Sequence, residues 1–303
     1  MYYQCCTGEE SGMFDKKKRN VLLLFIVPAL LMYVTFWILP VLMSFFYGVT
    51  NWSGMGEYKF IGLNNFKYLL KDGTMFNSMK NTVIYAVFVV TYGNIQALTL
   101  ALILNKKLKA KGFFRTVFYL PALFSTIVVA FLWSYVYAPY YGMISEIFNK
   151  LGLDVVPNLL GQKGTSLLAS AFVETWKTSG TMTIIYLAGL QNISEEVIES
   201  AKIDGCTGWQ AIRFVKIPML SNTITINVML GLIGGFKSFD YVFALTGGGP
   251  GNSSSTLMYS IYKMAFVESQ FGKAEALAAV AFLFILMISV IVLRIMKRKE
   301  LEA

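Results

Sequence analysis

Long apolar runs alternate with short polar segments along most of this 303-residue chain. Four runs without a charged side chain reach or exceed the roughly 20 residues that a helix needs to cross a bilayer. They cover 21–47, 82–104, 116–137 and 217–236. A fifth run over 166–190 contains Glu174 and Lys177, and a sixth over 274–293 has 18 consecutive uncharged residues. The pattern predicts an all-α integral membrane protein with six transmembrane helices in one domain over 21–293.

Composition and charge support this prediction and orient the helices. Hydrophobic residues make up 56% of the chain and charged residues only 14%, which departs from soluble averages in the direction of membrane proteins. Lys/Arg clusters lie just before the first predicted span and just after the last, so the tails 1–20 and 294–303 are expected in the cytoplasm. The net charge of +9 is then a signal of topology. No pattern typical of nucleic-acid binding accompanies it.

The three cysteines are expected on the cytoplasmic side, where thiols stay reduced. Cys5 and Cys6 precede the first span, and Cys206 lies between the fourth and fifth. Their spacing fits no metal site. Inert thiols and palmitoylation of Cys5 or Cys6 remain open interpretations.

The polar segment 191–218 separates two of the predicted spans and has the features of a folded loop. Ser194 can cap a short helix whose first turn is acidic, and Gly205 can end it. Thr207 and Gln210 have the spacing of a capping box that starts a second short helix. We predict a helix-turn-helix knob that projects from the membrane. A helix lying flat on the lipid surface is the alternative.

The segment resembles the EAA loop of permease subunits of binding-protein-dependent ABC importers. Glu-Ala-Ala is followed there by Asp-Gly and, ten residues after the glycine, by Ile-x-Leu-Pro. This chain keeps five of those positions as Glu199, Ala201, Asp204, Gly205 and Pro218. It departs from the pattern at three, where Ser200, Val215 and Ile217 replace Ala, Ile and Leu. The resemblance implies that these eight residues dock an ATPase subunit.

Two further stretches resemble sugar permeases of the maltose and glycerol-phosphate type. One is F-I-G-L-N-N-F at 60–66, and the other begins with T-G-G-G-P at 246–250. The glycines precede no Lys-Ser/Thr and follow no predicted strand, so they form a tight turn rather than a phosphate loop. The resemblance implies the type I ABC importer permease fold in a bacterial cytoplasmic membrane, and the first of two paired permeases.

The same resemblance implies a set of partners. They are a second homologous permease, two ATPase subunits that hold ATP and Mg, an external sugar-binding protein and a sugar or oligosaccharide. This chain is expected to bind no cofactor itself.

Polar residues at helical spacing inside the membrane mark a candidate substrate pathway, because ionisable groups there usually face a cavity. The fourth predicted helix carries Glu174, Lys177, Thr178 and Thr181. The fifth and its end carry Asn227, Gly231, Gly235 and Ser238. In the maltose permease that this chain resembles, the ligand pocket is built from the same two helices. The alternatives are helix packing by the small residues and a structural pair between Glu174 and Lys177.

Two other functions deserve comparison with the permease. An ion-coupled secondary carrier could use Glu174 as its coupling group. An integral membrane enzyme is the least favoured, because the chain has no histidine, no Walker A sequence and no evident nucleophile–base pair. We therefore expect no catalytic residue and no metal ligand in this chain.

Overall fold

A computed structural model describes residues 16–106, 109–153 and 157–301, and within these ranges every extended regular element is a helix. The predicted all-α class is confirmed. Cys5, Cys6 and most of the predicted N-terminal tail lie outside the described residues.

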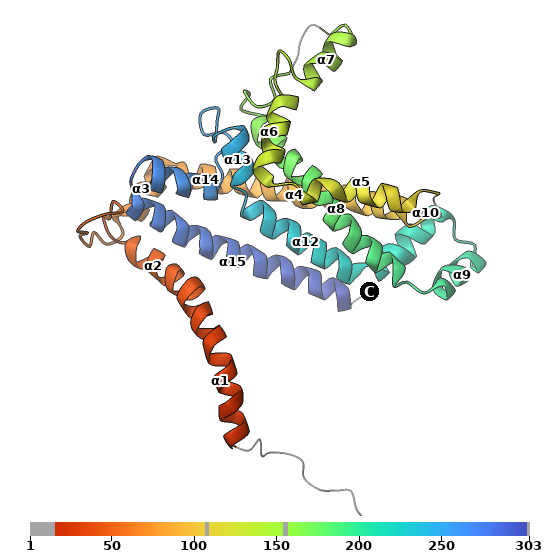
Figure 1. Cartoon of the computed structure of the whole chain (residues 1–303), viewed down its shortest axis with the longest axis horizontal. Coiled ribbons are helices and arrows are strands. Elements are labelled where there is room, and N and C mark those ends of the chain that lie inside the picture. Colours follow the sequence, from red (N-terminus) through yellow and green to blue (C-terminus); the bar gives the residue numbers. More distant parts are fainter. Residues whose placement is uncertain (1–15, 107–108, 154–156, 302–303) are drawn as a thin grey trace, which may run out of the picture.

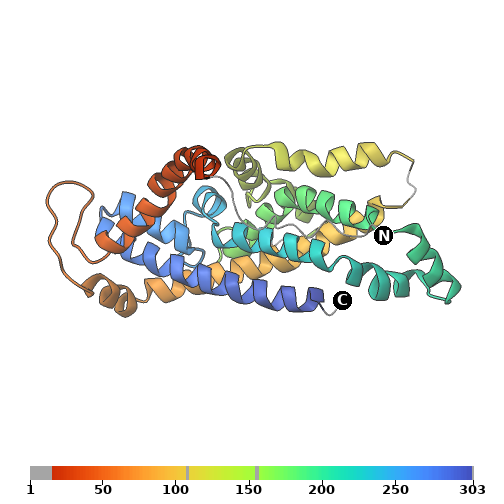
Figure 2. The same ribbon diagram turned by 90° about the horizontal axis from the view of Figure 1, so that it is seen from below.

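A bundle of long helices forms the body of the molecule, and its members lie side by side in both views (Figures 1 and 2). They are α4 (Thr74–Leu104), α8 (Ser166–Gln191), α12 (Ser221–Phe236) and α15 (Phe271–Leu301). At the N-terminus α1 (Lys16–Tyr33), the π-helical η1 (Val34–Ile38) and α2 (Leu39–Tyr47) form one helical stretch that diverges from the bundle (Figure 1).

Shorter helices connect the long ones. Before α8 these are α3 (Asn64–Asp72), α5 (Lys111–Leu123), α6 (Thr126–Val136) and α7 (Met143–Lys150). Between α8 and α12 lie α9 (Glu195–Ile203), α10 (Gly208–Gln210), η2 (Ala211–Lys216) and α11 (Ile217–Met219). Between α12 and α15 lie α13 (Asp240–Leu245), α14 (Leu257–Tyr262) and η3 (Lys263–Val267).

Three helical stretches of the described chain are long and apolar enough to cross a membrane, and two bent helix pairs raise the number to as many as five. The three are Leu24–Tyr47, Thr74–Leu104 and Phe271–Arg298. The helix α8, with 26 residues, is long enough but is not among them. Its polar side chains explain this, and the count of six spans stays a prediction.

Both bent pairs differ from the straight spans expected from the sequence. The range 116–137 is divided between α5 and α6, which meet at 100°. Pro121 lies in the last turn of α5 and Phe124 is extended (φ −74°, ψ 151°), so the helix cannot continue. The range 217–236 bends by 73° at Leu220. Pro218 lies in the short helix α11, and the long helix starts at Ser221.

Glycines allow the helix backbones to approach closely inside the bundle. A Cβ added at Gly180 of α8 would lie 2.4 Å from the carbonyl oxygen of Phe118 and 2.8 Å from Cα of Tyr119, both in α5. A Cβ added at Gly235 of α12 would lie 2.6 Å from Cα of Ala86 in α4. Small residues at such crossings are typical of helices packed in membranes.

The α5–α8 crossing makes a prediction about stability. Replacing Gly180 with alanine forces the two backbones apart, and overpacking of this kind costs about 1–3 kcal/mol. We expect the Gly180→Ala variant to melt about 2–8 °C below the native protein in detergent. Gly112→Ala is the matched control, because Gly112 lies in α5 with no atom within 4 Å of an added Cβ. Equal melting temperatures for native protein and Gly180→Ala would contradict the crossing.

Candidate functional site

The predicted knob between the fourth and fifth spans forms as two short helices with a turn between them. Gly205 ends α9 with φ +81°, a backbone region that favours glycine. The predicted capping box is confirmed: the Thr207 backbone N–H donates to Gln210 Oε1 at 2.8 Å, and the Gln210 N–H donates to Thr207 Oγ1 at 3.4 Å. Ser194 stands at the N-cap of α9, but its side chain makes no capping hydrogen bond, so the predicted cap is wrong.

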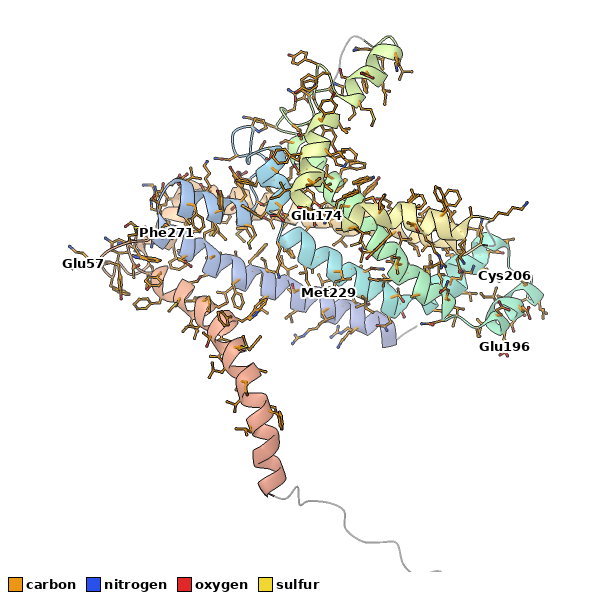
Figure 3. All side chains as sticks on the ribbon, viewed as in Figure 1. Glu57, Glu174, Glu196, Cys206, Met229 and Phe271 are labelled. Carbon is orange, nitrogen blue, oxygen red and sulfur yellow. The ribbon has the colours of Figure 1, made fainter. Side chains whose placement is uncertain are left out.

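The predicted docking loop 191–218 falls almost wholly within the segment 192–220, which connects α8 to α12 and is named the coupling loop after this prediction. It lies at one end of the bundle, where Figure 3 labels Glu196 and Cys206. Of the eight predicted docking residues, four are exposed: Glu199, Ser200, Asp204 and Gly205. Val215, Ile217 and Pro218 are half-buried, and Ala201 is buried.

Three large apolar side chains of the coupling loop point into solvent. Ile203 is 86% exposed, Trp209 69% and Phe214 66%. Apolar side chains gathered on one loop, between charged neighbours, are typical of a surface that another protein covers. Sequence reasoning placed the loop but did not select these three as docking residues.

Glu174 lies in the interior of the bundle, as Figure 3 shows, and only 6% of its surface is exposed. The hydroxyl of Tyr85, a fully buried residue of α4, donates a hydrogen bond to Glu174 Oε2 at 2.7 Å. Oε1 faces α12, where a Cβ added at Gly234 would lie 3.1 Å away. The carboxyl group is therefore held where α4, α8 and α12 meet.

The alternative interpretation, a structural ion pair between Glu174 and Lys177, is not formed among the described residues. Lys177 instead directs Nζ toward Thr126 Oγ1 of α6, at 3.4 Å. Residues three apart are neighbours on a helix, so the spacing alone would allow the pair. The two side chains diverge because Glu174 bonds to α4 and Lys177 to α6. The Tyr85 hydroxyl takes the place of the ammonium group as the partner of Glu174.

The remaining polar residues of the α8 stripe do not share one environment. Thr178 is half-buried and donates to the backbone oxygen of Glu174 at 2.8 Å. Thr181 is exposed. The stripe thus begins in the interior and reaches the surface of the single chain within two turns.

The α12 residues of the predicted pathway are all buried. Asn227 donates from Nδ2 to the backbone oxygen of Met182 in α8 at 3.3 Å, while its Oδ1 has no partner among the described residues. Ser238 is also buried, with Oγ unpaired within the described chain. Gly231 approaches Met182 and Val90, so for this glycine and for Gly235 the structure shows close helix packing.

Sequence reasoning missed α4 as a component of the site. Tyr85 holds Glu174, and Asn94 accepts a hydrogen bond at 2.6 Å from Tyr186 of α8. A detectable signal did exist, since buried polar residues recur along one face of α4 at steps of three and four. They are Ser78, Asn81, Thr82 and Tyr85.

The glycine-rich segment after α13 folds as the predicted tight turn, and side chains around it supply its hydrogen bonds. Ser254 donates to Thr246 Oγ1 at 2.8 Å and to the backbone oxygen of Gly249 at 2.7 Å. Gly248 has φ +74°, and an added Cβ would lie 2.4 Å from the ring of Tyr259. The backbone here is enclosed by the protein's own side chains.

Comparison with known proteins places this arrangement in a family. The model of the family described as "Binding-protein-dependent transport system inner membrane component" matches residues 93–299. The chain is 32% identical over 279 residues to the probable starch degradation products transport system permease protein AmyD of Thermoanaerobacterium thermosulfurigenes, with 92% of this chain and 94% of that protein covered. It is 33% identical over 278 residues to the multiple sugar-binding transport system permease protein MsmF of Streptococcus mutans, with 91% and 95% covered.

Among solved structures, the fold matches a chain of a bacterial ABC transporter involved in the import of the acidic polysaccharide alginate. The TM-score is 0.79 at 23% identity, with 94% of this chain and 97% of that chain covered. The chain therefore belongs to the family of binding-protein-dependent transport system inner membrane components.

Proposed function

We propose that this chain is one of two permease subunits of an ATP-driven importer that takes up a sugar or oligosaccharide delivered by an external binding protein. The description of the family names transport systems that depend on a binding protein. The names of its relatives AmyD and MsmF refer to starch degradation products and to multiple sugars. ATP and Mg would be held by two ATPase subunits in the cytoplasm.

The observation that carries this proposal is the position of the coupling loop. It joins α8 directly to α12, and these two helices carry Glu174 and Asn227. An ATPase bound to the exposed residues of the loop would pull on both helices at once. Closure of the ATPase pair would then change the spacing of α8 and α12 and move the site from outward to inward access.

The polar groups between α4, α8 and α12 suit a sugar. Carboxyl, amide and hydroxyl side chains exchange hydrogen bonds with ligand hydroxyls, each of which both donates and accepts. Tyr85 occupies one oxygen of Glu174 in the described conformation. We propose that separation of the helices opens the pathway and frees the Glu174 carboxyl and Asn227 Oδ1 for substrate.

The N-terminal helices supply the argument for a second permease. None of the apolar stretch Leu24–Tyr47 is buried within the single chain, and the stretch diverges from the bundle (Figure 1). Its α2 part contacts α15, where the rings of Phe45 and Phe282 lie 6.3 Å apart. The remaining apolar surface is left to lipid or to another subunit. We propose that the paired permease covers it. Six spans with both termini in the cytoplasm of a bacterial cell, as the basic clusters predict, complete the proposal.

The proposed function predicts the requirements for uptake in proteoliposomes. Vesicles that contain this chain, its paired permease and the ATPase subunits should accumulate radiolabelled sugar only with ATP inside and the binding protein outside. Replacing Glu174 with alanine should reduce uptake about 10- to 150-fold, because a hydrogen bond to a charged group contributes about 1.5–3 kcal/mol. Assembly and basal ATP hydrolysis should be unchanged.

Two controls separate this function from an ion-coupled carrier. Glu174→Gln keeps an oxygen that accepts from Tyr85 and should retain more uptake than Glu174→Ala. A carrier that needs the carboxyl to bind and release a proton would lose uptake in both variants. The purified chain alone, under a proton or sodium gradient, should transport nothing. Uptake by the chain alone would contradict the proposal.

The coupling loop makes a separate prediction about ATPase binding. Trp209→Ala should raise the Kd between the permease pair and the ATPase subunits about tenfold or more, since removal of an aromatic anchor costs about 2 kcal/mol. Leu151→Ala is the control, because Leu151 is equally exposed at 68% but follows α7, outside the loop. Kd values can be measured in detergent by fluorescence titration. An equal effect of both substitutions would rule out Trp209 as an anchor.

A further inference from the structure

A polar cavity of about 540 Å³ lies at the end of the bundle opposite the coupling loop. The turn between α3 and α4 forms one wall, and the segment 251–270 forms the other. Its volume falls within the range of about 300–1,000 Å³ that is typical of small-molecule sites. None of the predicted pathway residues lines it.

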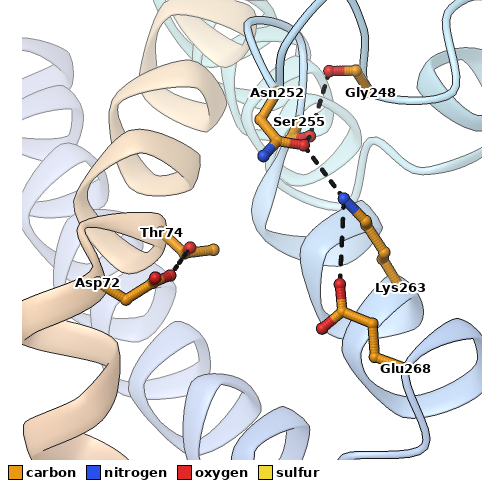
Figure 4. Close-up of polar contacts among 7 residues, drawn as sticks. All are labelled: Asp72, Thr74, Gly248, Asn252, Ser255, Lys263 and Glu268. Carbon is orange, nitrogen blue, oxygen red and sulfur yellow. Dashed lines mark hydrogen bonds and ion pairs between the residues drawn. The ribbon is translucent and has the colours of Figure 1, made fainter.

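The cavity wall is a hydrogen-bonded network, part of which Figure 4 shows. Lys263 Nζ donates to Asn252 Oδ1 at 3.3 Å and lies 4.0 Å from Glu268 Oε1. Across the cavity, Thr74 donates to the carboxylate of Asp72. Asn77 Nδ2 donates to the backbone oxygen of Asn252 at 2.9 Å, which ties the two walls together. These contacts connect the two walls of the cavity in the absence of a ligand.

The cavity lining contains charged groups of both signs. Asp72 and Glu268 are opposed within the lining by Lys263. Lys273 does not line the cavity, but its Nζ lies 3.5 Å from the centre of the Tyr68 ring at the cavity wall. The side chains of Lys263 and Glu268 remain 37% and 38% exposed, so both keep hydrogen-bonding capacity toward the cavity. A lining that contains both donors and acceptors suits a neutral ligand with many hydroxyl groups.

Two residues at the cavity hold an unusual backbone conformation. Asn252 has φ +61° and Ser269 has φ +54°, a left-handed region that few residues other than glycine adopt. Asn252 lines the cavity, and Ser269 lies between the lining residues Glu268 and Gln270. Such conformations cluster at ligand sites, because the surrounding structure must maintain them.

The lining also argues against a socket for another protein. The cores of protein interfaces are depleted in charged residues and enriched in aromatic residues and methionine. Here two carboxylates, one ammonium group and three amides line the wall, with one tyrosine and one methionine. The exposed Met55 and Phe60 of the preceding loop, at 88% and 75%, fit a protein contact better.

We propose that this cavity is a second saccharide site, which holds a neutral sugar unit at the outer end of the permease before it enters the pathway between the helices. The charged and amide groups bind the hydroxyls of the sugar, and Tyr68, with Lys273 over its ring, borders the site. The assignment of a sugar as ligand rests on the proposed function.

Saturation-transfer NMR on the assembled transporter in lipid nanodiscs, without binding protein, tests the proposal. The probes are maltotriose, cellotriose, trehalose and raffinose, each offered separately. Asn77→Trp fills the cavity from the exposed first turns of α4. Phe76→Trp is the matched control, because Phe76 is adjacent and 57% exposed but does not line the cavity. For the saccharide that the native transporter binds, Asn77→Trp should lower the transfer signal about fivefold or more, and Phe76→Trp should leave it unchanged.

A polar variant provides the second measurement. Lys263→Met with Glu268→Gln keeps the cavity open but removes two of its three charged groups, leaving Asp72. The Kd for the saccharide should rise about tenfold, as expected for loss of one or two hydrogen bonds. The proposal is overturned if no probe gives a signal, or if Asn77→Trp and Phe76→Trp behave alike. It is also overturned if Asn77→Trp lowers only the affinity of the transporter for the external binding protein, which would identify a docking surface.

The outcomes also separate this site from the proposed function. ATP-driven sugar uptake by a native transporter whose saccharide signal is insensitive to Asn77→Trp would leave the permease function intact and remove the second site. A saccharide signal that depends on Asn77 in a transporter without ATP-driven uptake would support the second site and contradict the proposed permease function.

Discussion

A carboxyl group in the interior of a membrane bundle requires a hydrogen-bond partner, because an unpaired polar group in such surroundings costs several kcal/mol. Tyr85 supplies this partner to Glu174 at 2.7 Å. The bond joins α4 to α8 at a position where α12 also approaches, within reach of Gly234. It therefore fixes how three helices meet, and with them the geometry of the candidate pathway. Any movement that offers Glu174 to a ligand must replace this bond with another.

The helix α4 organises the rest of the bundle through one polar face. Asn81 donates to the backbone oxygen of Ser255 at 3.0 Å, and Thr82 Oγ1 accepts from the backbone N–H of Leu257 at 2.8 Å. These bonds anchor the segment between α13 and α14 to α4. Close contact between Gly235 and Ala86 packs α12 against α4 as well. Polar bonds fix the register of the helices, and small residues fix their distance.

Local sequence patterns predicted the features of this chain that depend on neighbouring residues. Helix formation follows from long apolar runs, and the capping box of Thr207 and Gln210 follows from a spacing of three residues. The partner of Glu174 could not be predicted in this way, because Tyr85 is 89 residues away and Lys177 only three. The same limit applies to the bend at Leu220. Its 73° angle depends on packing between helices, whereas Pro218 indicates only that a helix begins nearby.

The distribution of hydrogen bonds determines which end of the bundle can move. At the end near the cavity, Thr256 donates to the backbone oxygen of Ser238, just beyond α12, at 2.8 Å, and the bonds from Asn81 and Thr82 tie the same segment to α4. At the opposite end, α8 and α12 continue into the coupling loop, which exposes most of its surface. A force on the loop therefore displaces the loop ends of α8 and α12 more than their tethered ends.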